Sequence, residues 1–354
     1  MQVLMVGPAP NVSGGVGSWV RLIFAHPPEG VEYRLVSTIT PKTAVAEYRG
    51  ANTRYLVGGV KNIHHFLRVL VSLKTLLKKE HCAFAHVHFA SYGSTLRKVL
   101  IAKSLKRNDV PYLLHAHGGA FESFYRSLPA VLRRQGSYFL ADSVGLIVLS
   151  TAMRLFYSAL VSPQKPIFTM PNPVILPKEL TPRGERACLR LVFLGRLGSH
   201  KGSDRVLHAI NRLPEQTRAH VEVWLAGDGE VAATRQLAQS LGLSGQVTVS
   251  EWIDAETRDR WLCESDVMIL PSRAEGVPMA LLEGMAWGLP IISSPVGGIP
   301  DIITDGQEGF LVPPDDIPAI SEAIQRFVEN RDLLREMSTQ ARRRAESLSL
   351  EKYR

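Results

Sequence analysis

The chain has 354 residues, of which 45% are hydrophobic and 21% are charged, and its formal net charge is +8. This balance is typical of a globular protein, and a chain of this length can form two domains of ordinary size. It contains no run of 18 or more apolar residues, so we expect no transmembrane helix. The segment from Met1 to Gly7 lacks the basic and long apolar regions of a signal peptide and is typical of a first strand. We therefore expect a cytoplasmic protein.

The charge is distributed unevenly between the two halves. Residues 1–177 contain 20 Lys and Arg against 7 Asp and Glu, whereas residues 178–354 contain 21 against 26. An excess of basic residues in one half is typical of a protein that binds nucleic acid, an anionic membrane or a phosphorylated substrate. The three cysteines lie far apart and no Cys/His spacing suits a zinc site, so we expect reduced thiols, buried rather than reactive.

In the first half, short apolar runs alternate with stretches of helical periodicity. The predicted strands are residues 3–6, 33–37, 85–89, 112–115 and 145–149, and predicted helices include 63–79 and 94–106. Buried strands that alternate with helices indicate a parallel sheet covered by helices on both faces.

Six prolines between residues 163 and 182 interrupt this pattern. Because proline lacks a backbone donor and restricts its neighbour, they predict an extended connector. We therefore expect an N-terminal domain over residues 1–172, a linker over 173–188 and a C-terminal domain over 189–354.

The second half repeats the β/α scheme. Its predicted strands are residues 190–194, 222–226, 246–249, 267–270, 290–293 and 310–312, and its predicted helices are 203–212, 231–241, 255–264, 279–287, 318–330 and 331–347. The fold class is therefore α/β, with two Rossmann-like β/α/β domains. Because ligands of open parallel sheets bind at the carboxyl ends of the strands, two such domains that face each other would share one cleft.

Two features of the first half follow predicted strands. Gly14-Gly15-Val16-Gly17 comes after the first strand and suits a phosphate or a tight turn, although its spacing matches neither a dinucleotide fingerprint nor a Walker A loop. His117 stands beside two glycines at the end of the fourth strand, and both a site role and a structural role remain open for it. His115 lies within the strand, so we expect it to be structural.

The second domain opens with two cations in one strand-to-helix loop, Arg196 and Lys201. Fixed cations stabilise the charge that grows on a diphosphate leaving group, without a metal ion. The alternative is a solvated loop with ordinary surface charges.

Two carboxylates follow the strand at 267–270. Glu275 precedes a helix expected to begin near Pro278, and Glu283 lies within that otherwise apolar helix. A carboxylate in apolar surroundings needs partners, and paired sugar hydroxyls are suitable donors. An internal salt bridge remains the alternative.

The arrangement Glu275-x7-Glu283, with Gly195-Arg196 and Lys201-Gly202 upstream, resembles the retaining glycosyltransferases of family GT4, which have the GT-B fold. The resemblance covers nearly the whole chain. It implies a metal-independent hexosyltransferase without a cofactor. Its donor would be a nucleotide sugar, most commonly a UDP sugar with GDP sugars still open, and its acceptor a glycan or polyprenyl-linked glycan of bacterial surface polysaccharide synthesis. No enzymatic nucleophile is expected, because retention in this family is usually explained by front-face attack.

The resemblance also implies roles for individual residues. Arg196 and Lys201 would hold the donor diphosphate, and Glu275 would bind the donor sugar. Glu283 would bind the ribose hydroxyls. Further contacts would come from Gly15 to a phosphate or the acceptor, from His117 to the sugar, from Trp252 and Ile253 to the base, and from backbone amides of the segment formed by Gly276, Val277, Pro278 and Met279. Glu251 stands where the family commonly has a glycine, and the sequence ends at Arg354, where the family's returning helix would begin.

Two basic regions of the first half, residues 63–79 and 125–134, also carry leucines. They predict either peripheral binding to an anionic membrane, on its inner face, or ordinary packing of a helix on its sheet. The alternatives to transfer are a nucleotide-sugar epimerase or phosphorylase on the same fold, a nucleic-acid-binding protein, and a non-catalytic subunit. No nucleic-acid motif accompanies the basic charge, so we expect no nucleic-acid partner.

Overall fold

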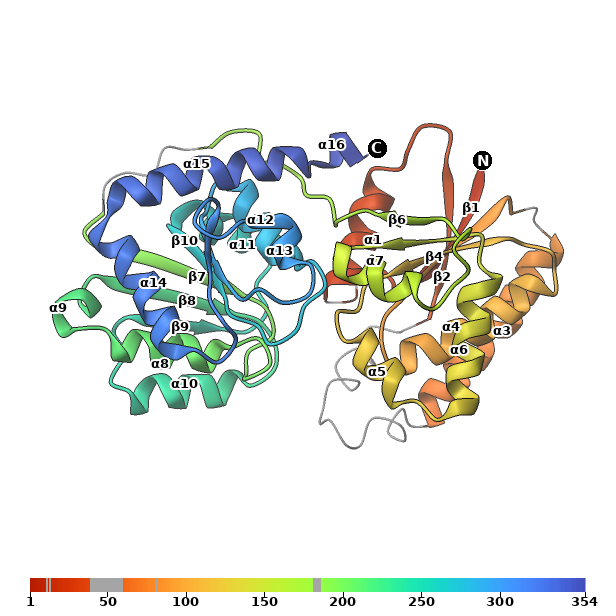
Figure 1. Ribbon diagram of the computed structural model, residues 1–354, viewed down its shortest axis with the longest axis horizontal. Helices are drawn as coiled ribbons and strands as arrows, with labels where there is room; N and C mark the ends of the chain where they lie inside the picture. The colour runs from red at the N-terminus through yellow and green to blue at the C-terminus, as the bar shows by residue number, and fades with distance from the viewer. Residues whose placement is uncertain (11, 13, 39–59, 80–81, 181–185, 354) are drawn as a thin grey trace. The chain divides into compact units, whose positions relative to one another are not determined.

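The computed structural model describes residues 1–10, 12, 14–38, 60–79, 82–180 and 186–353. Its contacts divide the chain into two compact units, Met1–Pro171 and Asn172–Arg354. Each unit is built on a six-stranded sheet with parallel neighbours and with helices packed on it (Figure 1). The predicted pair of parallel α/β units is therefore confirmed.

The sheet of the first unit has the order β2-β1-β3-β4-β5-β6. Its strands are β1 (Gln2–Gly7), β2 (Glu32–Ser37), β3 (Phe84–Phe89), β4 (Tyr112–Ala116), β5 (Gly145–Val148) and β6 (Ile167–Thr169). Its helices are α1 (Gly15–Ala25), α3 (Val60–Lys79), α4 (Gly93–Lys106), α5 (Phe121–Ser127), α6 (Ala130–Asp142) and α7 (Thr151–Ser158). The edge strand β6 was predicted as extended connector, because it has only three residues and follows Pro166.

The sheet of the second unit has the order β12-β11-β10-β7-β8-β9. Its strands are β7 (Leu189–Leu194), β8 (Val221–Ala226), β9 (Val247–Ser250), β10 (Val267–Leu270), β11 (Ile291–Ser293) and β12 (Gly309–Leu311). Its helices are α8 (Ser203–Arg212), α9 (Glu215–Arg218), α10 (Val231–Ser240), α11 (Ala255–Glu264), α12 (Met279–Ala286), α13 (Ile299–Ile302), α14 (Ile317–Glu329), α15 (Arg331–Ser347) and α16 (Leu350–Tyr353).

Each sheet reverses its strand order once. In the second unit the chain runs outward from β7 to β8 and β9, then returns to the other side of β7 as β10. In the first unit the reversal lies between β1 and β3. Ligands of open α/β sheets bind in the crevice beyond the carboxyl ends at such a reversal. The loops after β7 and β10 are therefore the first place to look for a site in the second unit.

The inner strands of each sheet are largely buried, whereas the edge strands β2, β6 and β9 are partly exposed. Every residue of β10 is buried, and Leu191, Val192 and Phe193 of β7 have no exposed surface. Among the described residues, none of the helices combines the length and the apolar character needed to cross a bilayer.

The loops beyond β7 and β8 touch backbone to backbone. Gly195 N donates to Ala226 O at 2.9 Å, and Leu197 N donates to Asp228 O at 2.7 Å. A Cβ atom added at Gly227 would lie 1.8 Å from Gly195 O, so only glycine fits there.

We expect Gly227→Ala to lower the free energy of unfolding of the second unit by roughly 2 kcal/mol or more, because the two loops must separate. Gly245→Ala is the matched control, since its added Cβ meets nothing within 4 Å. Urea unfolding followed by tryptophan fluorescence measures both variants. Equal midpoints for the two variants would contradict this account of the loops.

Candidate active site

Lys201 and Glu275 lie together at the carboxyl ends of β7 and β10. Lys201 Nζ is 2.5 Å from Glu275 Oε1, and Ser272 Oγ donates to the same oxygen at 2.7 Å. The side chain of Glu275 is 7% exposed and that of Lys201 is 24% exposed. A largely buried carboxylate thus holds a partly exposed cation at the reversal of the sheet.

Arg205 fixes the loop that carries Lys201. Its side chain is 4% exposed and donates to Ser199 O and to Pro271 O, each at 2.8 Å. It also lies 3.0 Å from Asp315 Oδ1. One buried guanidinium therefore ties the loop after β7 to the loop after β10, which is a role that spacing along the chain does not reveal.

Asp315 and Asp316 have separate structural roles. Asp315 accepts from Arg273 Nε at 2.9 Å, and Asp316 caps α14 by accepting from Ala319 N. Asp316 thus marks the start of α14.

Arg196 lies on the same loop as Lys201 and pairs with Asp228 of the loop after β8. Arg196 Nη1 is 3.3 Å from Asp228 Oδ2, and the two side chains are 28% and 42% exposed. Both cations that the sequence predicts for diphosphate binding are thus partly exposed at the carboxyl edge of one sheet, each opposite a carboxylate.

Glu283 has a partner that the sequence did not suggest. Arg258 Nη1, from α11, is 3.3 Å from Glu283 Oε1 on α12, and Arg258 Nη2 contacts Asp259 at 2.8 Å. Burial opposes the charge of Arg258, but the carboxylates of Glu283 and Asp259 outweigh it and raise its pKa. An internal salt bridge was the alternative that the sequence left open for these two carboxylates. Both Glu283 and Glu275 form such a salt bridge.

The segment after Glu275 is held through its backbone carbonyls. Gly298 N donates to Gly276 O, and Asn172 Nδ2 donates to Val277 O, both at 2.7 Å. Pro278 is the N-cap of α12, which begins at Met279 as predicted. This fixes the amides at the start of α12, where a helix offers N–H groups to an anion.

A close approach also fixes Glu275 itself. Gly297 has a φ of 60°, and a Cβ added there would lie 1.8 Å from Glu275 O. The loop after β11 therefore packs directly against the main chain of the carboxylate.

Trp252 and Ile253 follow β9 at the edge of the same sheet. Trp252 is 56% exposed, and Ile253 is half-buried just before Asp254, the N-cap of α11. The helix that starts here also carries Arg258, so the predicted base-binding loop and the predicted ribose carboxylate are joined through one helix.

Gly15 and His117 belong to the first unit. Gly15 is the first residue of α1, and a Cβ there would meet nothing within 4 Å of the described residues. His117 Nε2 lies 2.8 Å from His88 Nδ1, and burial with nearby His86 lowers the pKa of His117 to about 3. His117 is thus a neutral ring in a cluster of four histidines, which no motif in the sequence had indicated.

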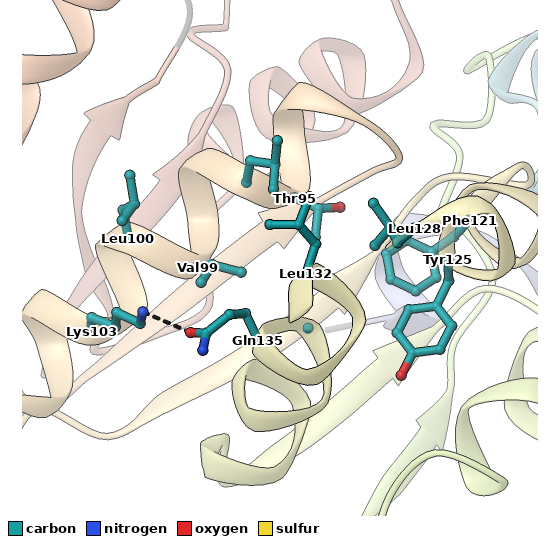
Figure 2. A pocket seen from close by; sticks show the side chains of 11 residues that line it. Thr95, Val99, Leu100, Lys103, Phe121, Tyr125, Leu128, Leu132 and Gln135 are labelled. Carbon is teal, nitrogen blue, oxygen red and sulfur yellow. Dashed lines mark hydrogen bonds between the residues drawn. The ribbon is translucent and has the colours of Figure 1, made fainter. Parts of the chain in front are cut away.

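The first unit also contains an apolar pocket of about 230 Å³ (Figure 2). It lies between α4, α5 and α6 rather than at the strand ends. Its walls are Thr95, Leu96, Val99, Leu100, Lys103, Phe121, Tyr125, Leu128, Leu132, Gln135 and Gly136. Lys103 donates to Gln135 at 2.8 Å at one side of it.

Comparison with known proteins finds sequence similarity for the second unit. Residues 188–344 match the family model described as "Glycosyl transferases group 1". The lipopolysaccharide core biosynthesis glycosyltransferase LpsE of Rhizobium meliloti is 33% identical over 144 residues, which cover 40% of each chain. The chain thus spans about two fifths of the length of this curated relative.

Solved structures resemble the whole chain at low identity. Sucrose-phosphate synthase from Thermosynechococcus elongatus has a TM-score of 0.78 at 20% identity, over 99% of this chain and 96% of that one. Anabaena HepE in complex with UDP-glucose has a TM-score of 0.75 at 15% identity, with the same coverage of 99% and 96%.

The solved structures agree with the two parallel sheets of the chain. The chain therefore has the GT-B fold, and its residues 188–344 are similar to the glycosyl transferases group 1 family.

Proposed function

We propose that the chain is a retaining, metal-independent glycosyltransferase that moves a sugar from a nucleotide diphosphate to a hydroxyl group. The observation that carries this proposal is the placement of Arg196, Lys201 and Glu275 on loops at the reversal of the second sheet. Two cations and a carboxylate in that place suit a diphosphate joined to a sugar.

In the proposed reaction the bond between the sugar C1 and the diphosphate oxygen breaks, and a bond from C1 to the acceptor oxygen forms on the same face. The acceptor proton passes to the departing phosphate oxygen. Arg196 and Lys201 stabilise the charge that grows on this leaving group, and the amides at the start of α12 add to it. No side chain is proposed as a nucleophile.

Glu275 and Glu283 divide the recognition of the donor. Glu275 Oε1 already accepts from Lys201 and Ser272, so its other oxygen is the acceptor we assign to a sugar hydroxyl. Glu283 accepts the ribose hydroxyls, and Arg258 lies beside its carboxylate at 3.3 Å. Trp252 and Ile253 lie on the loop that we assign to the base.

We propose a UDP sugar as the donor, with support from the UDP-glucose complex of HepE. The core-polysaccharide name of LpsE supports a glycan or lipid-linked acceptor in surface polysaccharide synthesis. In the first unit, we assign His117 to the sugar and Gly15 to a phosphate or the acceptor.

Removal of the ribose carboxylate should weaken donor binding. Titration calorimetry in a chelator, with UDP, GDP and ADP in turn, should show tight binding of one nucleotide. Glu283→Ala should weaken that binding at least tenfold, because the ribose hydroxyls then lose their acceptor. Glu256→Ala, an exposed glutamate on α11, is the control and should bind like the parent chain. Failure of all three nucleotides, or equal binding by Glu283→Ala, would count against the donor site.

Loss of either loop cation should slow the chemical step. We expect Arg196→Ala and Lys201→Ala each to lower kcat for release of UDP from UDP sugars by about 10²–10³, with a smaller change in KM. Arg212→Ala, an exposed arginine at the end of α8, should leave kcat unchanged. NMR of the freed sugar should show the anomer of the donor. A new sugar isomer formed without release of UDP would instead indicate an epimerase.

We also propose that the first unit binds to the surface of an anionic membrane. Leu67 and Val71 on α3 are 54% and 65% exposed beside Arg68 and Lys74, which are also exposed. Val131 on α6 is 74% exposed beside Arg133 and Arg134. Apolar side chains among cations suit the boundary between acyl chains and anionic headgroups.

Vesicles that contain phosphatidylglycerol should bind the chain, and added salt should release it, because screening removes the attraction to the headgroups. Replacing Arg133 and Arg134 together by alanine should weaken binding tenfold or more, at about 1 kcal/mol for each cation. Arg212→Ala serves again as the control. Vesicle binding that changes neither with added salt nor with the double substitution would contradict membrane contact through this surface.

A further inference from the structure

The four clustered histidines come from two adjacent strands. His86 and His88 lie on β3, His115 lies on β4, and His117 directly follows the last residue of β4. Alternate residues of a strand share one face, so each pair points to one side of the sheet. The parallel register places His88 directly beside His115, which brings the two pairs together as one ladder of rings.

The ladder contains a set of nitrogens close enough to share one ion. One ring nitrogen from each of His86, His88 and His115 lies within 4.8 Å of the other two. His86 Nε2 and His115 Nδ1 are 3.2 Å apart. Two nitrogens about 2.0–2.1 Å from a tetrahedral zinc ion are separated by about 3.3 Å, so this spacing already suits a metal.

The surroundings favour neutral ligands. His86, His88 and His115 are at most 8% exposed, and Trp19 of α1 packs against all three rings with centroid distances of 4.6–5.6 Å. Burial lowers the pKa of His86 to about 4 and lowers the pKa of the other two as well. The rings are therefore neutral near pH 7, and few protons compete for their lone pairs.

His88 has the arrangement of a metal ligand with an outer partner. Its Nδ1 is engaged by His117 Nε2 at 2.8 Å, whereas its Nε2 is buried with no hydrogen-bond partner among the described residues. A histidine that binds a metal through one nitrogen usually donates the other N–H to a neighbour, which fixes the ring. A buried nitrogen without a partner is unfavourable, and a bound ion would remove that penalty.

We propose that His86, His88 and His115 bind one transition-metal ion of the zinc or copper type in the first unit. The ion would join β3 to β4 as a structural centre, and His117 would orient His88. When the ion enters, His86 and His115 exchange their mutual hydrogen bond for bonds to the metal, and the proton of that hydrogen bond moves to the other nitrogen of its own ring. Imidazole nitrogens suit zinc and copper, whereas the absence of oxygen ligands from this group disfavours calcium and magnesium. His117 is shared with the proposed sugar contact, but the three proposed ligands take no part in the proposed transfer.

Metal content and a cobalt titration test the site. The full chain, freed of any affinity tag, should retain close to one equivalent of zinc or copper by elemental analysis. After chelation it should take up one equivalent of Co²⁺ with the visible absorption of a four- or five-coordinate ion, and Zn²⁺ should raise its Tm. Because the rings are buried, the chain is also refolded from denaturant in the presence of each metal, so that the ion can reach them. Separate refolding with Zn²⁺ and with Cu⁺ identifies which ion is bound.

Variants separate ligation from general destabilisation. His86→Gln and His88→Gln should lose the equivalent of metal and the rise in Tm, while His26→Gln, an exposed histidine of the same unit, should keep both. His117→Asn should retain the stoichiometry but weaken binding by about 10–100-fold, as expected for an outer partner. Circular dichroism checks that each variant folds. The proposal is overturned if the folded parent chain takes up no Zn²⁺, Co²⁺ or Cu⁺ after refolding, or if folded His86→Gln and His88→Gln bind metal as the parent does.

Discussion

Direct contact between backbones at the carboxyl edge of the second sheet is the constraint on which the candidate site depends. The loop after β8 touches the loop after β7 at Gly227, and the loop after β11 touches the main chain of Glu275 at Gly297. Since no side chain separates these loops, a small shift in one displaces the next. Arg205 adds a buried link between the loops after β7 and β10. The charged groups therefore stand on a framework that is fixed before any ligand arrives, as electrostatic catalysis requires.

The charges of the candidate site are balanced in pairs. Lys201 faces Glu275, Arg196 faces Asp228, and Arg258 faces Glu283. Such pairing lowers the cost of keeping ions at a half-buried surface, and the cations remain accessible enough to receive an anion. In the proposed function, a diphosphate adds its charge to Arg196 and Lys201, while the sugar and ribose hydroxyls satisfy the carboxylates. Donor binding would then rearrange existing ion pairs rather than create a charged site.

Local patterns predicted most strands and helices, because buried parallel strands and amphipathic helices have clear periodicities. They missed β6, whose three residues beside a proline look like connector. The same limit applies to the sites. Arg196, Lys201 and Glu275 stand out because glycines and strand ends mark them, whereas Arg205 and Arg258 are ordinary helical arginines until their distant partners are known. The histidine ladder depends on the register between β3 and β4, and two His-x-His segments alone do not disclose that register.

The most direct test of the central claim is a crystal structure of the chain with UDP bound. The account predicts that the diphosphate contacts Arg196 and Lys201 beyond β7, and that the ribose hydroxyls donate to Glu283 on α12. It also predicts the uracil beside Trp252 and Ile253. UDP bound elsewhere on the second unit, with the pairs Lys201–Glu275 and Arg258–Glu283 unchanged, would contradict it.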